Sequence, residues 1–429
     1  MKLLFINAPG KWAGKRQLIY PLGLAYVATY LKERLDSPEI HFLDLNMYKD
    51  YSHVLERAVK EFSPEIVGIE FRNAFYFSTP QASLLKDTVD KIKLTVPDSK
   101  VIIGGSGFSL FAEDIMKYIK NIDFGIFGEG EVPFWGLINS DFRAEKVKNV
   151  FFRNNNEIIY SGHSDSLVDP EELSVPKRDW DGLDLSKYNY HGFQTKRGCS
   201  FRCDYCPEPF LQGKYYRLYP LKRIKEELAY CVSLGIDKIF FVDTIFNLPL
   251  RFSMNVLDVL SDFKGVEFSA FFKVTGFNQS YINKLEETGF KEIYVSLENV
   301  DPSLLELNRT GINERAIEET TRLLYKSKLK VRYQFILGLP HEDFANRIKN
   351  MGFMLRLMVK SRFKDRVFAE PLAILPYTEL IKRHNIEIDL FNYPVFMRKL
   401  YWWYFPLLKI IQKMSDLFKL NILKLNKFK

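Results

Sequence analysis

Three of the four cysteines in this chain lie within eight residues, in the stretch TKRGCSFRCDYCPEP (195–209). Cys199, Cys203 and Cys206 have the spacing Cys-x3-Cys-x2-Cys, and Cys231 stands apart from them. In an intracellular chain, clustered thiols favour metal binding or catalysis over disulfide formation. We therefore expect these three thiols to bind a metal centre.

The number of thiols separates the possible metal centres. A structural zinc ion takes four ligands, usually in two separated pairs, so a fourth would have to come from Cys231 or His191. Electron-transfer clusters also take four thiolates, whereas three thiolates leave one iron of a four-iron cluster open to an outside ligand. Cys231 lies on the apolar side of a helical pattern, where a thiol behaves as a small hydrophobe. The spacing thus favours a four-iron cluster with an open iron, and a zinc loop is the alternative.

Short apolar runs alternate with amphipathic stretches through the first third of the chain. Repeated strand–helix–strand order predicts a doubly wound, Rossmann-like parallel sheet, which binds ligands at the carboxyl ends of its strands. Glycine-bearing turns follow two of the expected strands, but the first turn, NAPGKWAGK, lacks a G-x-G-x-x-G pattern, so a nicotinamide dinucleotide is not favoured. The expected strands are KLLFIN (2–7), EIHFLDL (39–45), EIVGIEF (65–71), KVIIGG (100–105) and DFGIFGEG (123–130), with helices that include 23–35 and 78–93.

A polar stretch, 146–189, predicts a connecting segment, after which the alternation resumes. Six further βα units are fewer than the eight of a closed barrel, so we expect a partial (β/α)6 barrel of TIM type. The cysteine loop follows the first of these strands, which places it at the active face. The expected strands are HGFQTKRG (191–198), KIFFVD (238–243), EFSAFFKV (267–274), EIYVSLEN (292–299), KVRYQFILG (330–338) and VFAEPLAI (367–374).

The net charge of +8 is concentrated at the end of the chain, where residues 391–429 contain seven Lys, one Arg and one Asp. The rest of the chain is close to neutral, so no nucleic-acid partner is expected. The same region has an aromatic cluster at 401–405, followed by a helical pattern. Two interpretations stay open: a helical cap packed on the barrel, or an amphipathic segment on an anionic membrane. The apolar face of the pattern consists of Leu407, Ile410, Ile411, Met414, Leu417 and Phe418.

Length and composition indicate a folded protein without a membrane span. With 429 residues, of which 47% are apolar, the chain suits two or three domains. The longest apolar run near its end, LYWWYFPLL (400–408), is far shorter than the roughly 20 residues of a spanning helix. The start, MKLLFINAPG, is typical of a buried strand and lacks the features of a signal peptide. We expect a cytoplasmic protein, or one that is peripheral at a membrane.

The cysteine loop, with Gly198 before it and Tyr205 inside it, resembles the signature of the radical S-adenosylmethionine (radical SAM) superfamily. In that family three thiolates hold a [4Fe-4S] cluster whose open iron binds S-adenosylmethionine, and one electron cleaves the sulfonium to a 5′-deoxyadenosyl radical. The resemblance implies that Cys199, Cys203 and Cys206 are the metal ligands and catalytic residues. It also implies a reductant protein of the ferredoxin or flavodoxin type.

Other stretches resemble the family's cofactor-binding segments. VDTIFN (242–247) resembles the segment that meets the methionine part, and SLEN (296–299) the ribose-binding stretch, where a carboxylate accepts two hydrogen bonds. FILGLPHED (335–343) resembles the glycine motif that packs on adenine, although many relatives have Gly-Glu at 340–342, where this chain has Pro-His-Glu. Lys273 could meet the cofactor carboxylate or be a solvated lysine at the barrel rim. The implied SAM-binding residues are Tyr205, Asp243, Thr244, Lys273, Ser296, Glu298 and Gly338.

The first α/β region resembles the cobalamin-binding domain that precedes many radical SAM domains, and the resemblance covers most of residues 1–135. The region lacks an Asp-x-His-x-x-Gly motif, since neither His41 nor His53 has that context, which implies a cobalt without a protein histidine below it. A sheet with tight turns and no ligand is the alternative. Methylthiolating relatives carry three further cysteines in this domain, and this chain has none there. The implied cobalamin-binding residues are Pro21, Gly23, Asn73, Gly104, Gly105, Ser106, Gly107, Phe108, Gly128, Glu129, Gly130 and Glu131.

These resemblances divide the chain into four segments: 1–145, cobalamin-binding-like; 146–189, connecting; 190–380, the radical SAM barrel; and 381–429, a basic helical C-terminal region. They imply an enzyme that cleaves S-adenosylmethionine and, with cobalamin, methylates an unactivated carbon. Its substrate is expected to be hydrophobic or a lipid. A non-methylating enzyme that forms or rearranges rings, and a non-catalytic cobalamin or redox sensor, stay open as alternatives.

Overall fold

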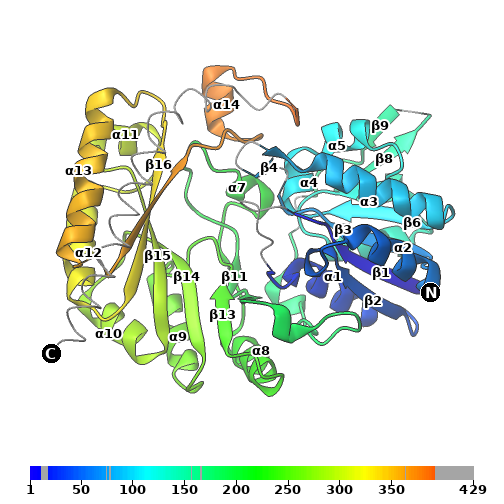
Figure 1. The fold of residues 1–429 in the computed structure, drawn as a ribbon, viewed down its shortest axis with the longest axis horizontal. Coiled ribbons are helices and arrows are strands. Elements are labelled where there is room, and N and C mark those ends of the chain that lie inside the picture. Colours follow the sequence, from blue (N-terminus) through cyan, green and yellow to red (C-terminus); the bar gives the residue numbers. More distant parts are fainter. Residues whose placement is uncertain are drawn as a thin grey trace. The chain divides into compact units, whose positions relative to one another are not determined.

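The computed structural model describes residues 1–10, 18–73, 75–76, 79–155, 157–164, 167–362 and 364–391 (Figure 1). These residues form two compact units. The first unit contains Met1–Gly198, Pro207–Ile239 and the described part of Glu387–Tyr393, and the second contains Cys199–Cys206 and Phe240–Ile386. The aromatic and amphipathic segment expected over 400–429 lies outside the described residues.

A seven-stranded sheet forms the first unit, in the order β2-β1-β3-β6-β7-β8-β9. The first five strands of this order are parallel, and the chain passes from β1 to β2 on one side and then to β3 on the other. A ligand site is therefore expected where β1 and β3 end, because the strand order reverses there. The elements are β1 (Lys2–Asn7), α1 (Leu22–Lys32), β2 (Glu39–Asp44), α2 (Tyr51–Phe62), β3 (Ile66–Glu70), β4 (Phe75–Tyr76), β5 (Thr79–Pro80), α3 (Ala82–Thr95), β6 (Lys100–Gly104), α4 (Ser106–Leu110), α5 (Ala112–Tyr118), β7 (Phe124–Ile126), α6 (Glu131–Asn139), β8 (Val150–Asn154), β9 (Glu157–Tyr160), β10 (His191–Phe193), β11 (Lys196–Arg197), α7 (Glu208–Leu211), β12 (Arg217–Leu218) and α8 (Leu221–Ser233), with short 3-10 turns at Leu45–Met47, Ala144–Lys146, Pro170–Glu172 and Leu185–Lys187.

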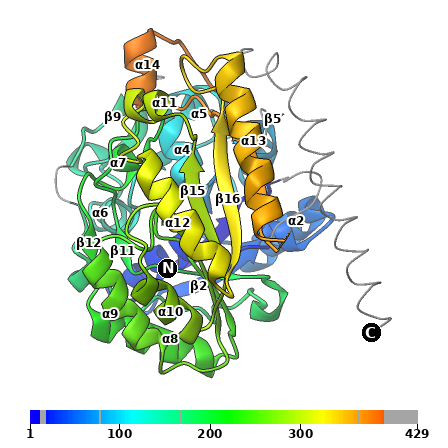
Figure 2. The ribbon, with the colours of Figure 1, turned by 90° about the vertical axis from the view of Figure 1, so that its left-hand side faces the viewer.

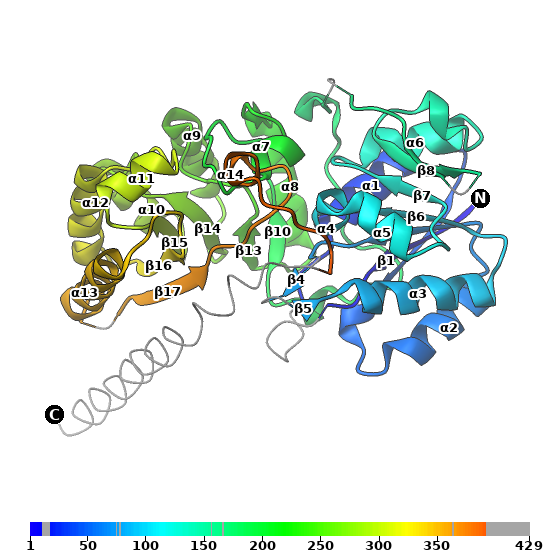
Figure 3. The same ribbon diagram turned by 90° about the horizontal axis from the view of Figure 1, so that it is seen from above.

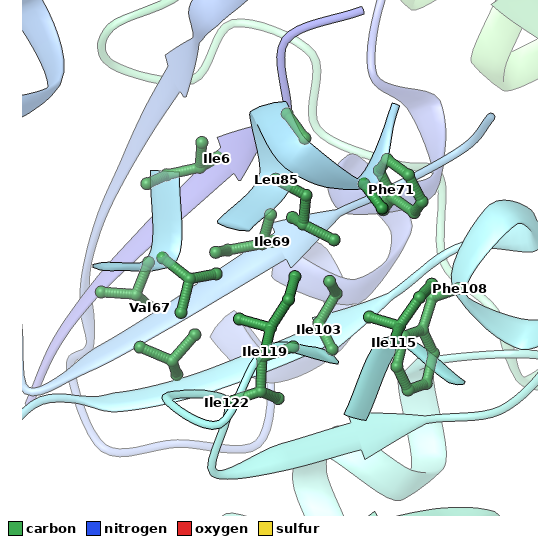
Figure 4. Close-up of a cluster of buried hydrophobic side chains, with 14 of the residues drawn as sticks. Ile6, Val67, Ile69, Phe71, Leu85, Ile103, Phe108, Ile115, Ile119 and Ile122 are labelled. Carbon is green, nitrogen blue, oxygen red and sulfur yellow. The ribbon is translucent and has the colours of Figure 1, made fainter. Parts of the chain in front are cut away.

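The core of this unit follows from the alternation of side chains along the parallel strands. Ile6, Ile69 and Ile103 belong to one buried cluster together with Leu85 of α3 and Ile115 of α5 (Figure 4). On the other face, the ring of Phe5 lies 5.6 Å from that of a phenylalanine in α6. Figure 3 accordingly shows α2 and α3 on one side of the sheet and α1 and α6 on the other. This layered arrangement leaves the strand ends as the accessible edge.

Residues 150–160 differ from the connecting segment that their polarity predicts. They form the antiparallel strands β8 and β9, which extend the first sheet beyond β7. The stretch FFRNNNEIIY places two β-favouring runs on either side of asparagines, and Asn155 adopts a positive φ of 46°. The Phe151 and Tyr160 rings stack 4.5 Å apart across the hairpin. Asn154 and Asn155 therefore lie in a β-hairpin rather than in a linker.

The second sheet has the order β10-β13-β14-β15-β16-β17, and within the second unit the strands β14 to β17 are parallel. One face of β15 and of β16 is buried, and Figure 2 shows α12 and α13 over these two strands. The expected α/β class, a doubly wound sheet followed by a partial barrel, is confirmed. The elements are β13 (Lys238–Phe241), α9 (Leu250–Leu260), β14 (Glu267–Lys273), α10 (Gln279–Glu287), β15 (Phe290–Glu298), α11 (Pro302–Leu307), α12 (Glu314–Lys326), β16 (Lys330–Leu337), α13 (Phe344–Lys360), β17 (Arg366–Pro371) and α14 (Glu379–His384). In the part of the chain that is described, no helix has both the length and the apolar character needed to span a bilayer.

Candidate active site

The three-cysteine loop belongs to the second unit. Cys199 is buried, Cys203 and Cys206 are half-buried, and none of them forms a disulfide. The Cys206 amide donates a hydrogen bond to the Cys203 carbonyl (3.1 Å), which makes a tight turn between these two thiols. The described residues contain no three His, Cys, Asp or Glu side chains that could hold one metal ion. A four-iron cluster makes a different demand, since it takes each thiolate on a separate iron.

Asp204 fixes this loop from within. Its buried carboxylate accepts a hydrogen bond from Arg309 and forms an ion pair with Arg383, whose Nη1 lies 2.7 Å away. Its amide donates to the Asn308 carbonyl (3.1 Å), and its carbonyl accepts from the Leu380 amide (2.8 Å). The turn after α11 and helix α14 therefore both hold the cysteine loop in place through contacts with Asp204. No local sequence pattern indicates these contacts, because the partners of Asp204 lie more than a hundred positions away along the chain.

Charged and phenolic groups surround Cys203. The Lys273 ammonium lies 4.0 Å from the Cys203 sulfur and 4.3 Å from the ring centre of Phe201. Burial raises the pKa of the Cys203 thiol to about 11, which the Lys273 ammonium opposes and the Glu298 carboxylate reinforces. A metal must therefore displace a firmly held proton at Cys203, and Lys273 assists that step.

Glu298 ends β15 in an unusual conformation. The pairing of β15 with β16 shifts between Ser296 and Glu298, and Glu298 adopts a positive φ of 64°. Such a conformation is costly for a residue with a side chain and is concentrated at functional sites. Burial raises the pKa of the Glu298 carboxyl above its usual value, and the Lys273 ammonium opposes this shift. The bulge thus holds a buried carboxylate at the end of the strand, near Tyr205, which also acts on its pKa.

Lys273 is held in place by Asn247, a residue that sequence reasoning did not single out. The Asn247 side chain accepts from the Lys273 amide (3.0 Å) and donates to the carbonyls of Lys273 (3.0 Å) and Thr275 (2.7 Å). Ser296 stands opposite Lys273 in register and donates to the Gln334 side chain (3.4 Å). These contacts favour the cofactor-facing interpretation of Lys273, which is buried, over a solvated lysine at the rim.

The glycine turn after β16 is closed by Glu342. The Gly338 amide donates to its carboxylate (2.6 Å), and the side-chain amide of Asn299 donates to the same group (3.3 Å). Glu342 therefore connects the turn after β16 to the turn after β15. Asp243 and Thr244 lie just after the end of β13 and belong to the second unit; Asp243 is buried and Thr244 is half-buried.

These residues fit the expected cluster and S-adenosylmethionine. The Tyr205 hydroxyl is buried beside the Glu298 carboxylate, and no hydrogen bond of good geometry satisfies it among the described residues. Burial and the Glu298 carboxylate raise the pKa of Tyr205 well above its ordinary value, so the hydroxyl keeps its proton. Buried polar groups without partners are rare, and they indicate a place for a ligand. Tyr205, Glu298 and Lys273 would face S-adenosylmethionine, and the three thiols would hold the cluster.

In the first unit, the strand ends present a glycine turn at the edge of the sheet. Gly105 has a φ of 100°, and a Cβ there would lie 2.8 Å from the Phe71 carbonyl oxygen. Ser106 is exposed and donates to the Arg72 carbonyl (2.9 Å), which joins the turn after β6 to the segment after β3. Exposed Asn73 continues that segment. The turn can therefore approach a flat ligand with its backbone.

Orphaned polar atoms support a ligand at this edge. The Asn7 side-chain nitrogen and one oxygen of Glu70 are buried without a hydrogen-bond partner in the described chain. Both residues end neighbouring strands, and Nε of Arg72 lies 3.7 Å from that oxygen. Gly23 makes room for Glu70, since a Cβ at Gly23 would meet the other carboxylate oxygen at 2.7 Å. A polar ligand such as cobalamin fits these unsatisfied groups and the glycine turn.

Several residues expected to face cobalamin have other roles. Phe108 is fully buried in the core, where its ring occupies the space that a side chain at Gly125 would need. Gly107 and Pro21 are buried beside it and at the start of α1, respectively. Residues 106–110 form the short helix α4, in which Gly107 and Phe108 are buried. Which of these side chains face the core depends on that helix and could not be predicted from the sequence alone.

Glu129 and Glu131 are engaged in ion pairs. Arg197 donates to Glu131 (2.7 Å) and lies 3.4 Å from Glu129, which Arg217 also contacts at 2.5 Å. Burial disfavours ionisation of Glu129, but the two guanidinium groups outweigh it and hold the pKa of Glu129 below its usual value. The two carboxylates therefore anchor the β11–β12 hairpin, while Gly128 keeps its positive φ of 72° in the turn.

The two candidates for a fourth metal ligand are occupied within the first unit. His191 is buried, with Nε2 3.2 Å from the Leu185 carbonyl oxygen and its ring beside those of Tyr20 and Tyr188. Cys231 is fully buried in α8. His191 and Cys231 are therefore part of the packed interior of the first unit.

Comparison with known proteins identifies two domains in this chain. A family model for the radical SAM superfamily matches residues 193–354, and one for the B12 binding domain matches residues 16–138. An uncharacterized methyltransferase of Pyrococcus horikoshii is 27% identical over 357 residues, which cover 80% of this chain and 75% of that protein.

Two solved structures share the fold. The radical S-adenosylmethionine methyltransferase TsrM from Kitasatospora setae, with cobalamin and a [4Fe-4S] cluster bound, has a TM-score of 0.76 at 20% identity and covers 88% of this chain and 73% of its own. The cobalamin-dependent S-adenosylmethionine radical enzyme OxsB, with aqua-cobalamin and S-adenosylmethionine bound, has a TM-score of 0.73 at 15% identity and covers 90% and 62%.

These matches confirm the family expected from the cysteine loop and from the glycine turns of the first unit. This chain has a B12 binding domain ahead of a radical SAM domain, the domain order of cobalamin-dependent radical SAM enzymes, and the cofactors of these two domains are a [4Fe-4S] cluster, S-adenosylmethionine and cobalamin.

Proposed function

We propose that this protein is a methyltransferase that places a methyl group on an unactivated carbon. The proposal is carried by one observation: the same chain has a three-thiol loop beside Lys273 and Glu298 and a B12 binding sheet whose edge has unsatisfied polar atoms. When bound, the cluster supplies the electron that splits S-adenosylmethionine, and cobalamin carries the methyl group to be transferred.

The residues of the second unit bind and orient. Cys199, Cys203 and Cys206 hold the cluster, and Asp204 fixes the spacing of the loop through its two arginines. The Lys273 ammonium provides a positive charge beside Cys203 and suits the carboxylate of S-adenosylmethionine. Glu298 can accept two ribose hydroxyl protons. Cys199, Lys273 and Glu298 are buried, which limits the access of water to the bond to be broken.

The inner face of the barrel sheet supports a hydrophobic substrate. Half-buried aromatic rings of Phe271 and Tyr294 lie 5.2 Å apart on this face. Arg332 lies 5.2 Å from the Tyr294 ring and 5.5 Å from the Phe368 ring, and its charge is balanced by Glu292 at 2.5 Å. An aromatic surface with a neutralised charge favours an apolar molecule, of which a lipid is one class.

Anaerobic reconstitution with iron, sulfide and cobalamin tests the proposal. With a strong reductant, or with a ferredoxin or flavodoxin as the electron donor, the protein should release 5′-deoxyadenosine and S-adenosylhomocysteine. Cys203→Ala should abolish both products, whereas Cys231→Ala, a matched change at a core thiol, should retain them. A protein that binds both cofactors yet never cleaves S-adenosylmethionine would be a sensor, and cleavage without a methylated product would indicate ring formation or rearrangement.

The basic C-terminal region is tested separately. If residues 400–429 lie on an anionic membrane, deleting them should weaken liposome binding. Unchanged liposome binding would exclude the membrane interpretation for this segment and favour the alternative, a helical cap packed on the barrel.

A further inference from the structure

Helix α13 exposes a stripe of large apolar side chains. Phe344, Ile348, Leu355 and Val359 are 69%, 51%, 44% and 60% exposed, although they lie in the last helix of the barrel layer (Figure 2). Their spacing places them along one narrow face of an α-helix, opposite the buried face. Single exposed apolar residues are common, but four in one continuous row indicate an interaction surface.

Basic residues flank this stripe. Lys349, Arg356 and Lys360 are exposed and follow the next row around the helix, and α13 contains no acidic residue. A groove of about 410 Å³ between α12 and α13 is lined by two acidic residues, Glu314 and Glu318, as well as by Lys349 and Arg356. Even so, the two helices together have seven Lys or Arg against three Glu, so the surface stays positive. An apolar stripe beside a basic one is typical of helices that lie in a membrane interface.

The charge decides between the possible occupants. A second copy of the chain would bring one basic helix against another. The C-terminal region, with seven Lys and one Arg against one Asp, has the same sign and would also be repelled. A nucleic acid would meet the charges but leave the apolar stripe in water. Only an anionic, partly apolar surface satisfies both rows at once.

We propose that the exposed face of α13 docks on an anionic lipid bilayer, with Phe344, Ile348, Leu355 and Val359 in the interfacial layer and Arg356 and Lys360 against the lipid headgroups. This surface is made of described residues of the second unit and is independent of the C-terminal region and of the chemistry at the cysteine loop. It places the protein at a membrane whether or not its substrate is a lipid.

Co-sedimentation of the full chain with vesicles tests this proposal. The protein should bind vesicles of phosphatidylcholine with phosphatidylglycerol and not vesicles of phosphatidylcholine alone. Ile348→Asp with Val359→Asp should lower the partition coefficient by about tenfold or more, because two apolar side chains are withdrawn from the interface. Arg356→Glu with Lys360→Glu should lower binding at low salt and weaken its salt dependence.

Leu94→Asp is the matched control, since Leu94 is an 85% exposed leucine in a helix of the first unit, and it should bind vesicles as the unaltered chain does. All variants replace exposed side chains, so unchanged circular dichroism and thermal midpoints are expected. Binding of both α13 variants at the unaltered level would overturn the proposal. A dimer in vesicle-free solution that Ile348→Asp with Val359→Asp dissociates, or faster proteolysis of the C-terminal region in that variant, would also overturn it, in favour of a second copy or of that region as the occupant.

Discussion

Replacing Glu298 by Gln should weaken binding of S-adenosylmethionine while leaving the cluster in place. The side chain keeps its size but loses its charge and one of its two acceptor oxygens. Because the Glu298 carboxylate raises the pKa of the Cys203 thiol, its removal makes Cys203 easier to deprotonate. Iron binding should therefore not suffer, and a loss of affinity can be assigned to the cofactor.

The size of the effect follows from burial. Glu298 is only 8% exposed, so its hydrogen bonds to the ribose would be made away from water. A hydrogen bond to a charged group contributes about 1.5–3 kcal/mol, and 1.4 kcal/mol corresponds to a tenfold change in affinity. The dissociation constant of S-adenosylmethionine should therefore rise by about 10- to 150-fold.

Anaerobic titration calorimetry of the reconstituted protein measures this constant, with iron and sulfide analysis as the check on the cluster. Glu306→Gln is the matched control, because Glu306 is exposed on α11 in the same unit. A change of less than about threefold, with the cluster intact, would show that Glu298 does not bind the ribose and would refute this reasoning.

Three further changes probe the supports of the site. Asp204→Asn should lower the affinity for cluster iron by about 10- to 100-fold, measured as iron retained against a chelator, because the loop loses its charge-assisted contacts. Glu227→Gln should lower the free energy of unfolding by about 3–5 kcal/mol in a denaturant titration, because it strands the fully buried guanidinium of Arg178, 2.6 Å away. Burial, helped by Arg178, lowers the pKa of His191 to about 4. The free energy of unfolding, which this group supports fully above pH 6.5, should therefore fall by about 2 kcal/mol between pH 7 and 5. In thermal unfolding, His191→Gln should lose less stability over the same pH range.

Each of these predictions has a contrary result, and the Glu227→Gln prediction also has a matched control. Glu226→Gln, at an exposed neighbour of Glu227, should leave stability within about 0.5 kcal/mol, and an equal loss in both variants would contradict the buried pair. Full iron retention in Asp204→Asn would show that the loop keeps its shape without the arginines. An identical pH profile for His191→Gln and the unaltered chain would assign the acid sensitivity to other groups.

Local patterns predicted much of this fold. The period of two in the strands and the helical spacing between them gave the order of elements, and the spacing of the three cysteines indicated the chemistry. Both signals lie within a few residues of one another, so a single sequence contains them. Residues 150–160 were predicted to be part of a connecting segment because the stretch is polar around its asparagines. They form the strands β8 and β9 instead, and the apolar, β-favouring runs on either side of the asparagines were the signal for these strands.

The supports of the site could not be predicted in the same way. Arg197 meets Glu131, and Asp204 meets Arg309, across 66 and 105 positions of the chain, and no local pattern encodes such pairs. Phe108 follows a glycine turn that suits a ligand, yet its own side chain turns into the core. The short helix that rotates it inward is set by packing against Phe71 and Gly125 rather than by propensity.

The central claim is that the protein supplies three ligands to a four-iron cluster and leaves one iron for S-adenosylmethionine. Electron paramagnetic resonance of the reduced, oxygen-free protein, recorded before and after S-adenosylmethionine is added, tests it most directly. The claim predicts a cluster signal that changes on addition and is lost in Cys203→Ala. Zinc in place of iron, or a cluster signal that S-adenosylmethionine leaves unchanged, would contradict it.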